Sequence, residues 1–233
     1  MDSDDILSKN CLNILLNNSK EYDIMVFNYI KIYDYNKYMN KYNFKLETKH
    51  IFDRNEFLKN IFEDYKGFLW NKIYKMDIIR DFEIKFDEDS YICEDLLFNT
   101  RYGLHIKKGI YLNYVGYLYY QNLGGSYNNQ KDIKWFSIIN TYDKIENILL
   151  QNDIDFQILH YEKYDRMYIY CEAIIRNKIN KNKFNGIETA KKYIKQNYKI
   201  VFSSKYISLK KKIKLFLFIK FPKLVYKYKK RRR

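Results

Sequence analysis

Three carboxylates stand within the first five residues of the chain. Asp2, Asp4 and Asp5 flank Ser3 in the segment DSDD. Like charges this close repel one another unless a cation lies among them, and carboxylate oxygens are hard ligands that suit Mg²⁺ or Mn²⁺. Such ions usually also take phosphate oxygens from a substrate. A metal site is one interpretation of the segment. From these four residues alone an acidic, solvated terminus, with Ser3 or Asp4 capping the following helix, is favoured, because charge runs usually face solvent.

A second acidic pair, Glu94 and Asp95, opens the segment EDLLFN. Adjacent acids at the start of a helix interact favourably with the helix dipole, which gives them a purely structural role. A carboxylate held beside a reacting hydroxyl group can instead act as a general base. Both interpretations remain open from these two residues alone.

Aromatic, glycine and histidine residues add weaker signals. Gly67 precedes FLWNKIYK, in which Trp70 has a ring that can stack on a sugar or pack in a core. Gly124-Gly125-Ser126 can be a simple turn. His105 and His160 are isolated, and a lone histidine has a structural or surface role more often than a metal-binding role.

Helices and strands alternate over the first 130 residues, which predicts an α/β unit. Apolar residues at helical spacing predict a helix within 6–19, and β-branched and aromatic residues predict a strand over 22–33. Asp53 is a suitable N-cap for the next helix. The remaining predicted elements are a helix over 53–64, a helix over 93–103, a strand over 106–121 and mainly helical structure over 131–200.

The positive charge of the chain is concentrated at its C-terminus. Of 43 Lys and Arg residues, 13 lie in 205–233, where there is no acidic residue; 30 remain against 28 acidic residues in 1–204. A basic groove over the whole fold is therefore excluded. The apolar run Leu215–Ile219 between lysines suits an anionic membrane surface, with nucleic-acid attraction as the competing interpretation.

Cysteine usage and the N-terminus indicate the compartment. Cys11, Cys93 and Cys171 are few and far apart, which fits a reducing cytoplasm better than a disulfide framework or a zinc site. The acidic N-terminus has no apolar signal segment. We therefore expect a cytoplasmic protein that is peripheral on the inner face of the cell membrane.

Taken together and in order, the motifs are more specific than any one of them. DSDD before a helix, FLWNKIYK, EDLLFN, a strand with LYYQN, and GGS closely resemble family-2 glycosyltransferases, which are inverting enzymes of the GT-A fold in bacterial surface-glycan pathways. The resemblance covers roughly residues 1–130. It implies the C-terminal part of a GT-A-like mixed-sheet domain over 1–130, a helical region over 131–204 and a basic membrane-associating tail over 205–233.

On the donor side, the resemblance assigns the DSDD segment to the DxD motif. Asp2 and Asp4 would bind Mn²⁺ or Mg²⁺ and the diphosphate of a nucleotide-diphosphate sugar, with Asp5 nearby. In the family this motif lies in mid-domain, after a region that binds the nucleotide. This chain starts at the motif, so we expect it to be truncated relative to the family.

On the acceptor side, the resemblance makes Asp95 the base that deprotonates the acceptor hydroxyl group, with Glu94 in a supporting role. Trp70 and Asn71 would line the site of a glycan or lipid-linked acceptor. The expected function is thus sugar transfer in cell-surface polysaccharide biosynthesis. The alternatives are a non-catalytic remnant or accessory subunit with a membrane-binding tail, and a nucleic-acid-binding protein, which the near-neutral body disfavours.

Overall fold

A computed structural model describes residues 3–34, 44–121 and 137–154, together with 159, 162–163, 192, 195–196, 198–203 and 207–221. The chain forms two compact units: 1–87 with 94–129, and 88–93 with 130–233. The elements of the first unit are β1 (Ile6–Leu7), α1 (Cys11–Ser19), β2 (Ile24–Ile32), β3 (Lys49–Phe52), α2 (Arg54–Asn60), β4 (Lys72–Tyr74), α3 (Met76–Asp81), α4 (Glu94–Gly103) and β5 (Gly109–Tyr120).

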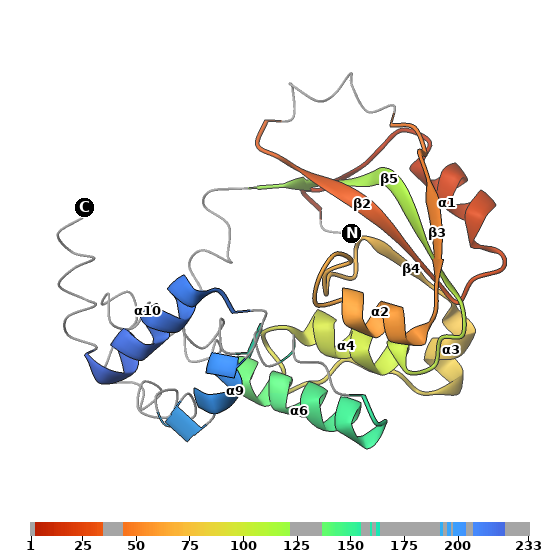
Figure 1. Ribbon diagram of the computed structural model, residues 1–233. Helices are drawn as coiled ribbons and strands as arrows, with labels where there is room; N and C mark the ends of the chain where they lie inside the picture. Colours follow the sequence, from red (N-terminus) through yellow and green to blue (C-terminus); the bar gives the residue numbers. More distant parts are fainter. Residues whose placement is uncertain are drawn as a thin grey trace. The chain divides into compact units, whose positions relative to one another are not determined.

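Strand β5 is central to the mixed sheet of the first unit (Figure 1). It runs parallel to β2, from Ile24 opposite Gly109 to Ile32 opposite Tyr120, with a register shift around Asn28. On its other side β5 pairs antiparallel first with β3 and then with β1. Strand β4 pairs antiparallel with β2. The predicted mixed α/β architecture is therefore confirmed.

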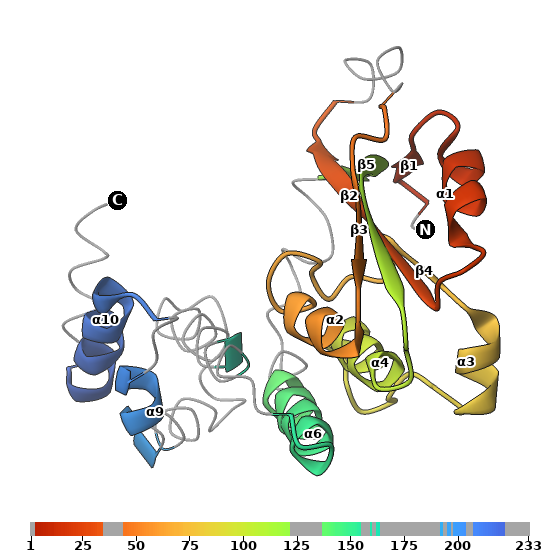
Figure 2. The same cartoon turned by 45° about the vertical axis from the view of Figure 1, so that its right-hand side comes forward.

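Helices cover the two faces of this sheet. Helix α1 packs on one face, and α2 and α4 lie together on the other (Figure 2). The core under α1 consists of Cys11, Leu15, Met25, Phe27, Ile110, Leu112, Tyr114 and Tyr117. On the α2 side, Gly103 allows close helix packing, because a Cβ atom there would lie 2.6 Å from Leu58 Cδ2.

The elements predicted within the first unit are present, with shifted bounds. Asp53 caps α2 as expected, since its Oδ1 accepts from the Glu56 backbone N–H over 2.8 Å. Helix α2 ends at Asn60 rather than Asp64, because 61–64 form turns. The expected helix within 6–19 begins only at Cys11, since Ile6–Leu7 pairs with β5 instead.

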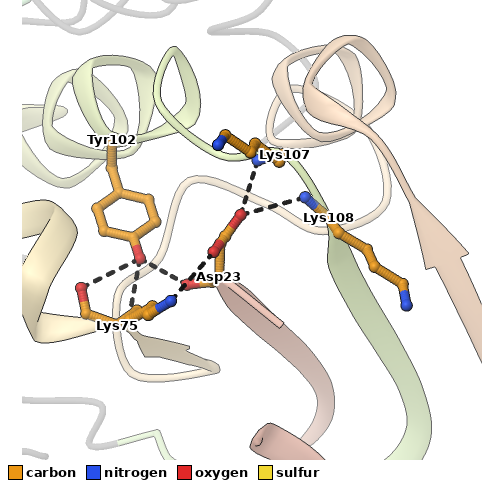
Figure 3. Close-up of polar contacts among 5 residues, drawn as sticks. All are labelled: Asp23, Lys75, Tyr102, Lys107 and Lys108. Carbon is orange, nitrogen blue, oxygen red and sulfur yellow. Dashed lines mark hydrogen bonds and ion pairs between the residues drawn. The ribbon is translucent and has the colours of Figure 1, made fainter. Parts of the chain in front are cut away.

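A polar cluster at one end of the sheet ties α4 to three strands (Figure 3). The Tyr102 hydroxyl group donates to the Asp23 carbonyl oxygen over 2.6 Å and accepts from the Lys75 backbone N–H over 2.9 Å. The Asp23 carboxylate accepts from the backbone N–H groups of Lys107 and Lys108. These bonds join the start of β2, the end of β4 and the approach to β5, and so fix the helix that carries Glu94 and Asp95.

The regular elements described in the second unit are helices, and residues 88–93 form turns and irregular structure. It contains α6 (Ser137–Gln151), α9 (Tyr198–Ser203) and α10 (Leu209–Lys220). The Lys163 side chain is buried and forms ion pairs with Asp143 and, over 3.0 Å, with Glu146 of α6. Most of the predicted helical region, and Gly124-Gly125-Ser126, lie outside the described residues. Among the helices described here, none is long and apolar enough to span a membrane.

Candidate functional site

The second acidic motif lies at the N-terminus of α4. Glu94 and Asp95 occupy its first turn, directly after Cys93, whose φ of 62° is left-handed. Asp95 is partly buried, and its negative charge contributes to raising the pKa of Tyr74, which burial raises most. The same carboxylate interacts electrostatically with Lys72. A half-buried acid at a helix N-terminus, in electrostatic interaction with a buried lysine, has the setting of a proton-transfer group.

Asn99 connects this helix to the loop that contains Trp70. Its Nδ2 donates to the carbonyl oxygens of Gly67 and Asp95, each over 2.9 Å, and its Oδ1 accepts from the Tyr74 hydroxyl group. Loop 67–71 approaches α4 very closely, since a Cβ atom on Gly67 would lie 2.9 Å from Leu96 Cδ1 and 3.3 Å from Leu96 Cα. Glycine is therefore required here for steric reasons.

Lys72 organises the loop from inside. Its Nζ donates to the carbonyl oxygens of Tyr65, Lys66 and Phe68, over 3.1, 2.7 and 2.7 Å, and to Asn71 Oδ1 over 2.9 Å. Burial lowers the pKa of the Lys72 ammonium group well below its usual value, and the charge of Asp95 opposes that shift. The four oxygen acceptors around Lys72 Nζ favour its protonated form, because the ammonium group has three N–H donors and the neutral amine has only two.

Asn71, predicted to contact substrate, is itself a buried part of this loop. Its Nδ2 donates to the carbonyl oxygens of Tyr65 and Phe27, over 3.1 and 3.3 Å, and its Oδ1 accepts from Lys72. The amide group is thus occupied by bonds within the protein. The structure gives Asn71 a role in positioning the loop beside β2.

Trp70 belongs to an aromatic stack on the α1 face of the sheet. Its ring lies 4.7 Å from that of Phe68 and 4.5 Å from that of Tyr117, with interplanar angles of 13° and 19°. Tyr119 stacks at 5.4 Å and Tyr29 meets the indole edge-on at 4.7 Å. The Trp70 side chain is partly exposed, so it combines a packing role with a surface on which a sugar ring can stack.

The N-terminal acidic segment is anchored beside this stack. Asp5 is buried, and its two carboxylate oxygens accept from the Tyr117 hydroxyl group over 2.6 Å and from the Tyr120 backbone N–H over 2.7 Å. Asp4 is exposed, and Asp2 lies outside the described residues. Across the described part of the chain, no group of three or more His, Cys, Asp or Glu side chains is arranged to hold a metal ion. Of the two carboxylates described in this segment, Asp4 is the exposed one and Asp5 the buried one.

The predicted site residues thus fall into two groups. Asp5 and Trp70 are linked through Tyr117, and Asn71 and Asp95 are linked through Lys72. Loop 67–71 belongs to both groups. The roles of Tyr117, Lys72 and Asn99 were not predicted, because nothing in their sequence spacing distinguishes a buried polar partner from an exposed side chain.

The two lone histidines add nothing to these groups. His105 stacks on Phe82 with 3.7 Å between ring centroids, and burial lowers the pKa of its imidazole. A stacked, partly desolvated imidazole fits the structural role that is commoner for such residues. His160 lies outside the described residues.

Comparisons with known proteins support the fold. No protein-family model matches the sequence, and no curated protein matches it either. The solved structure of S. aureus TarS 1-349 in complex with UDP-GlcNAc matches with a TM-score of 0.52 and 19% identity, over 82% of this chain and 54% of that chain. TarS 1-349 without that ligand matches at a TM-score of 0.41 and 19% identity, over 72% and 45% of the two chains.

These figures define what the likeness shows. At 19% identity the likeness shows the fold alone: the mixed α/β fold of this chain is similar to that of the UDP-GlcNAc complex of TarS 1-349. The chain spans about half the length of the TarS structure that it matches, 54%. The fold is thereby shown, and activity, substrates and partners are matters for proposal.

Proposed function

We propose that the chain acts as an inverting glycosyltransferase of GT-A type in cell-surface polysaccharide biosynthesis. It would transfer a sugar from a nucleotide-diphosphate donor to a glycan or lipid-linked acceptor. The observation that carries the proposal is the placement of Asp95, whose charge acts on the buried Lys72, in the first turn of α4, in a domain with a fold similar to that of TarS. The UDP-GlcNAc bound to TarS supports a nucleotide sugar as donor.

In the proposed reaction, the Asp95 carboxylate takes the proton of the acceptor hydroxyl group. The acceptor oxygen attacks the anomeric carbon in line, the bond from that carbon to the diphosphate oxygen breaks, and the configuration inverts. Trp70 offers a face for the acceptor sugar. Asp2 and Asp4 would hold Mn²⁺ or Mg²⁺, which would neutralise charge on the departing diphosphate.

The positive charge of Lys72 acts on the Asp95 carboxylate. A buried ammonium group near Asp95 favours its ionised form, which is the form that accepts a proton. Asn99 holds the first turn of α4 against loop 67–71 and so keeps the base and Trp70 on one framework. The acceptor would be positioned by a rigid element rather than by a free loop.

The test separates donor binding from proton transfer. UDP and several nucleotide sugars are titrated calorimetrically with and without Mn²⁺, and release of UDP is followed with a panel of glycan acceptors. We expect Asp95→Asn to reduce transfer by about 10²-fold or more while UDP binding is retained. The adjacent Glu94→Gln is the matched control and should lose much less. Undiminished transfer by Asp95→Asn would overturn the assignment of the base.

A non-catalytic accessory protein is the second candidate, and the state of Asp5 favours it. Both carboxylate oxygens of Asp5 are engaged by β5, which leaves fewer oxygens for a metal in the acidic segment. Such a protein would keep the acceptor-side surface but bind no nucleotide sugar. Absence of metal-dependent UDP binding, in a chain that is folded by circular dichroism, would favour this candidate over the enzyme.

We also propose that residues 205–233 bring the protein to the cytoplasmic face of an anionic membrane. In α10, Leu209, Ile213, Phe216 and Leu217 are exposed and spaced so that they form one apolar stripe. Lysines on the same helix can meet anionic headgroups while the stripe enters the interface.

Vesicle sedimentation tests this attachment. The full chain should bind vesicles that contain phosphatidylserine and should bind neutral vesicles weakly. Phe216→Ser with Leu217→Ser should reduce binding, whereas Phe202→Ser on α9 serves as an exposed aromatic control. Unchanged binding of the double variant would exclude the apolar stripe and leave charge attraction alone, of the kind that also draws nucleic acid.

A further inference from the structure

A separate polar pocket opens on the face of the sheet that carries α2. Its volume is about 510 Å³, within the range usual for small-molecule sites, and its lining includes Asn28, His50, Glu56, Asp64, Tyr65 and Tyr111. Asn28 lies in β2 between Phe27 and Tyr29, which contact the α1 side, so its own side chain points to the opposite face. The pocket is therefore distinct from the Trp70 stack.

One wall of the pocket is held by a chain of hydrogen bonds. The Tyr111 hydroxyl group donates to Asn28 Oδ1 over 2.7 Å, and Asn28 Nδ2 donates to Asn113 Oδ1 over 2.8 Å. Asn113 Nδ2 in turn donates to Glu47 Oε2 over 2.6 Å. The orientation of each amide group is thereby determined, which reduces the entropy that a ligand must overcome to bind.

The other wall is built around Glu56. Its Oε1 lies 2.6 Å from His50 Nε2 and accepts from the Tyr65 hydroxyl group over 3.3 Å. The Tyr65 ring stacks on Tyr111, with 5.4 Å between centroids and an interplanar angle of 15°. Both walls therefore meet at the tyrosine pair, in which Tyr65 is buried and Tyr111 is partly exposed.

The chemistry of the lining restricts the ligand. Two carboxylates, Glu56 and Asp64, line the pocket with one imidazole, His50, which pairs with Glu56, and no Lys or Arg is in the lining, so a phosphate or another anion is disfavoured. No hydrogen bond to the Asp64 carboxylate is present among the residues that the structure describes. Carboxylate and amide oxygens accept from hydroxyl groups, amide N–H groups donate to them, and tyrosine rings pack on the apolar face of a sugar.

We propose that this pocket binds a neutral sugar residue of the acceptor glycan, in addition to the contact proposed for Trp70. The proposal rests on the proposed glycosyltransferase function for the origin of the ligand, although binding itself needs no turnover. A second contact of this kind would retain a growing glycan between transfers and raise its effective concentration at the reaction centre.

Ligand-observed NMR on the full chain tests this proposal with neutral oligosaccharides, among them chitotriose, cellotriose and maltotriose. We expect at least one of them to bind, and Asp64→Asn to weaken that binding about tenfold, because a charged hydrogen-bond acceptor is lost. Asn60→Trp should abolish binding by filling the pocket, since Asn60 also lines it. Glu63→Gln, next to Asp64 but outside the lining, is the matched control and should bind normally.

Parallel titrations with UDP and with a hexalysine peptide distinguish the outcomes. Binding of UDP with no oligosaccharide binding would overturn the proposed sugar site and leave the proposed enzyme activity unaffected. Oligosaccharide binding that disappears in Asn60→Trp, without any UDP binding, would support the pocket and argue against the enzyme. Binding of hexalysine in place of any sugar would identify a cationic ligand and overturn the proposal. Sugar binding that all pocket variants retain would do the same.

Discussion

The Tyr117 hydroxyl group donates a hydrogen bond to the Asp5 carboxylate over 2.6 Å. The ring of the same tyrosine stacks on Trp70, so one residue of β5 connects the N-terminal acidic segment to the loop between α2 and β4. The two segments are more than sixty positions apart in the sequence. Their proximity is a property of the sheet, since β1 pairs with the part of β5 that contains Tyr117.

Replacing Tyr117 by Phe should destabilise the first unit while keeping its aromatic packing. A hydrogen bond to a buried carboxylate contributes about 1.5–3 kcal/mol, so the free energy of unfolding should fall by roughly that amount. Urea denaturation measures the change. Tyr29→Phe is the matched control, because Tyr29 contacts the same indole ring, and it should change stability by less than about 0.5 kcal/mol.

Lys72→Met should be more damaging than any change at an exposed lysine. The substitution leaves several buried carbonyl oxygens without a donor, which we expect to lower the free energy of unfolding by about 3 kcal/mol or more. Lys75→Met in the same motif is the control, since the Lys75 side chain is exposed and its ion pair with Asp23 spans 3.8 Å. Equal effects of the two changes in chemical denaturation would contradict the buried role of Lys72.

Gly67→Ala should force the loop away from α4. The added Cβ atom would meet Leu96 at distances that include its backbone, so side-chain movement alone cannot make room. Overpacking of this kind costs about 1–3 kcal/mol. Hydrogen exchange provides a local measurement: the N-terminal turn of α4 should lose protection more than β2 does. Equal protection in both proteins would show that the loop tolerates a side chain.

Stability should fall in alkaline solution because of the buried tyrosines. Burial raises the pKa of Tyr102 and of Tyr74 above the usual tyrosine value of about 10. Above pH 10 the unfolded chain therefore releases these protons before the folded chain does, which favours unfolding. Their stabilising contribution is complete below pH 10 and is lost as the pH rises towards the folded-state values.

Tyr102→Phe isolates one of these groups. The free energy of unfolding of this variant should be lower than that of the unchanged protein at neutral pH, because the bond to the Asp23 carbonyl oxygen is lost. Above pH 10 it should decline less steeply. The difference in slope should reach about 1.4 kcal/mol per pH unit for one proton. Urea denaturation from pH 8 to 11 measures it. Tyr33→Phe, at an exposed position, should leave the slope as it is.

Local chemistry made several elements predictable. A run of β-branched and aromatic residues was sufficient for β2, and Asp53 capped α2 because a carboxylate three residues before a backbone N–H satisfies a group that the helix leaves free. The position of Glu94 and Asp95 in the first turn of α4 followed from the helix dipole. Each of these depends on contacts within a few residues.

Long-range pairing decided the rest. Ile6–Leu7 has no local reason to leave a helix, and does so because β5 offers backbone partners. Asp5 and Asn71 are of the residue types that usually face solvent, so their burial could not be anticipated from their own neighbours in the sequence.

The sequence by itself determined helices α1, α2 and α4, strands β2 and β5, the positions of the acidic motifs and the separation of a basic tail from a near-neutral body. Only the tertiary structure decided which carboxylate is engaged by β5 and which lysine is buried within reach of the charge of Asp95. It also decided that a polar pocket lies on the face of the sheet opposite the Trp70 stack. The physical reason is that burial and hydrogen-bond partnership depend on segments brought together by sheet pairing, and single-sequence patterns report only on neighbours along the chain.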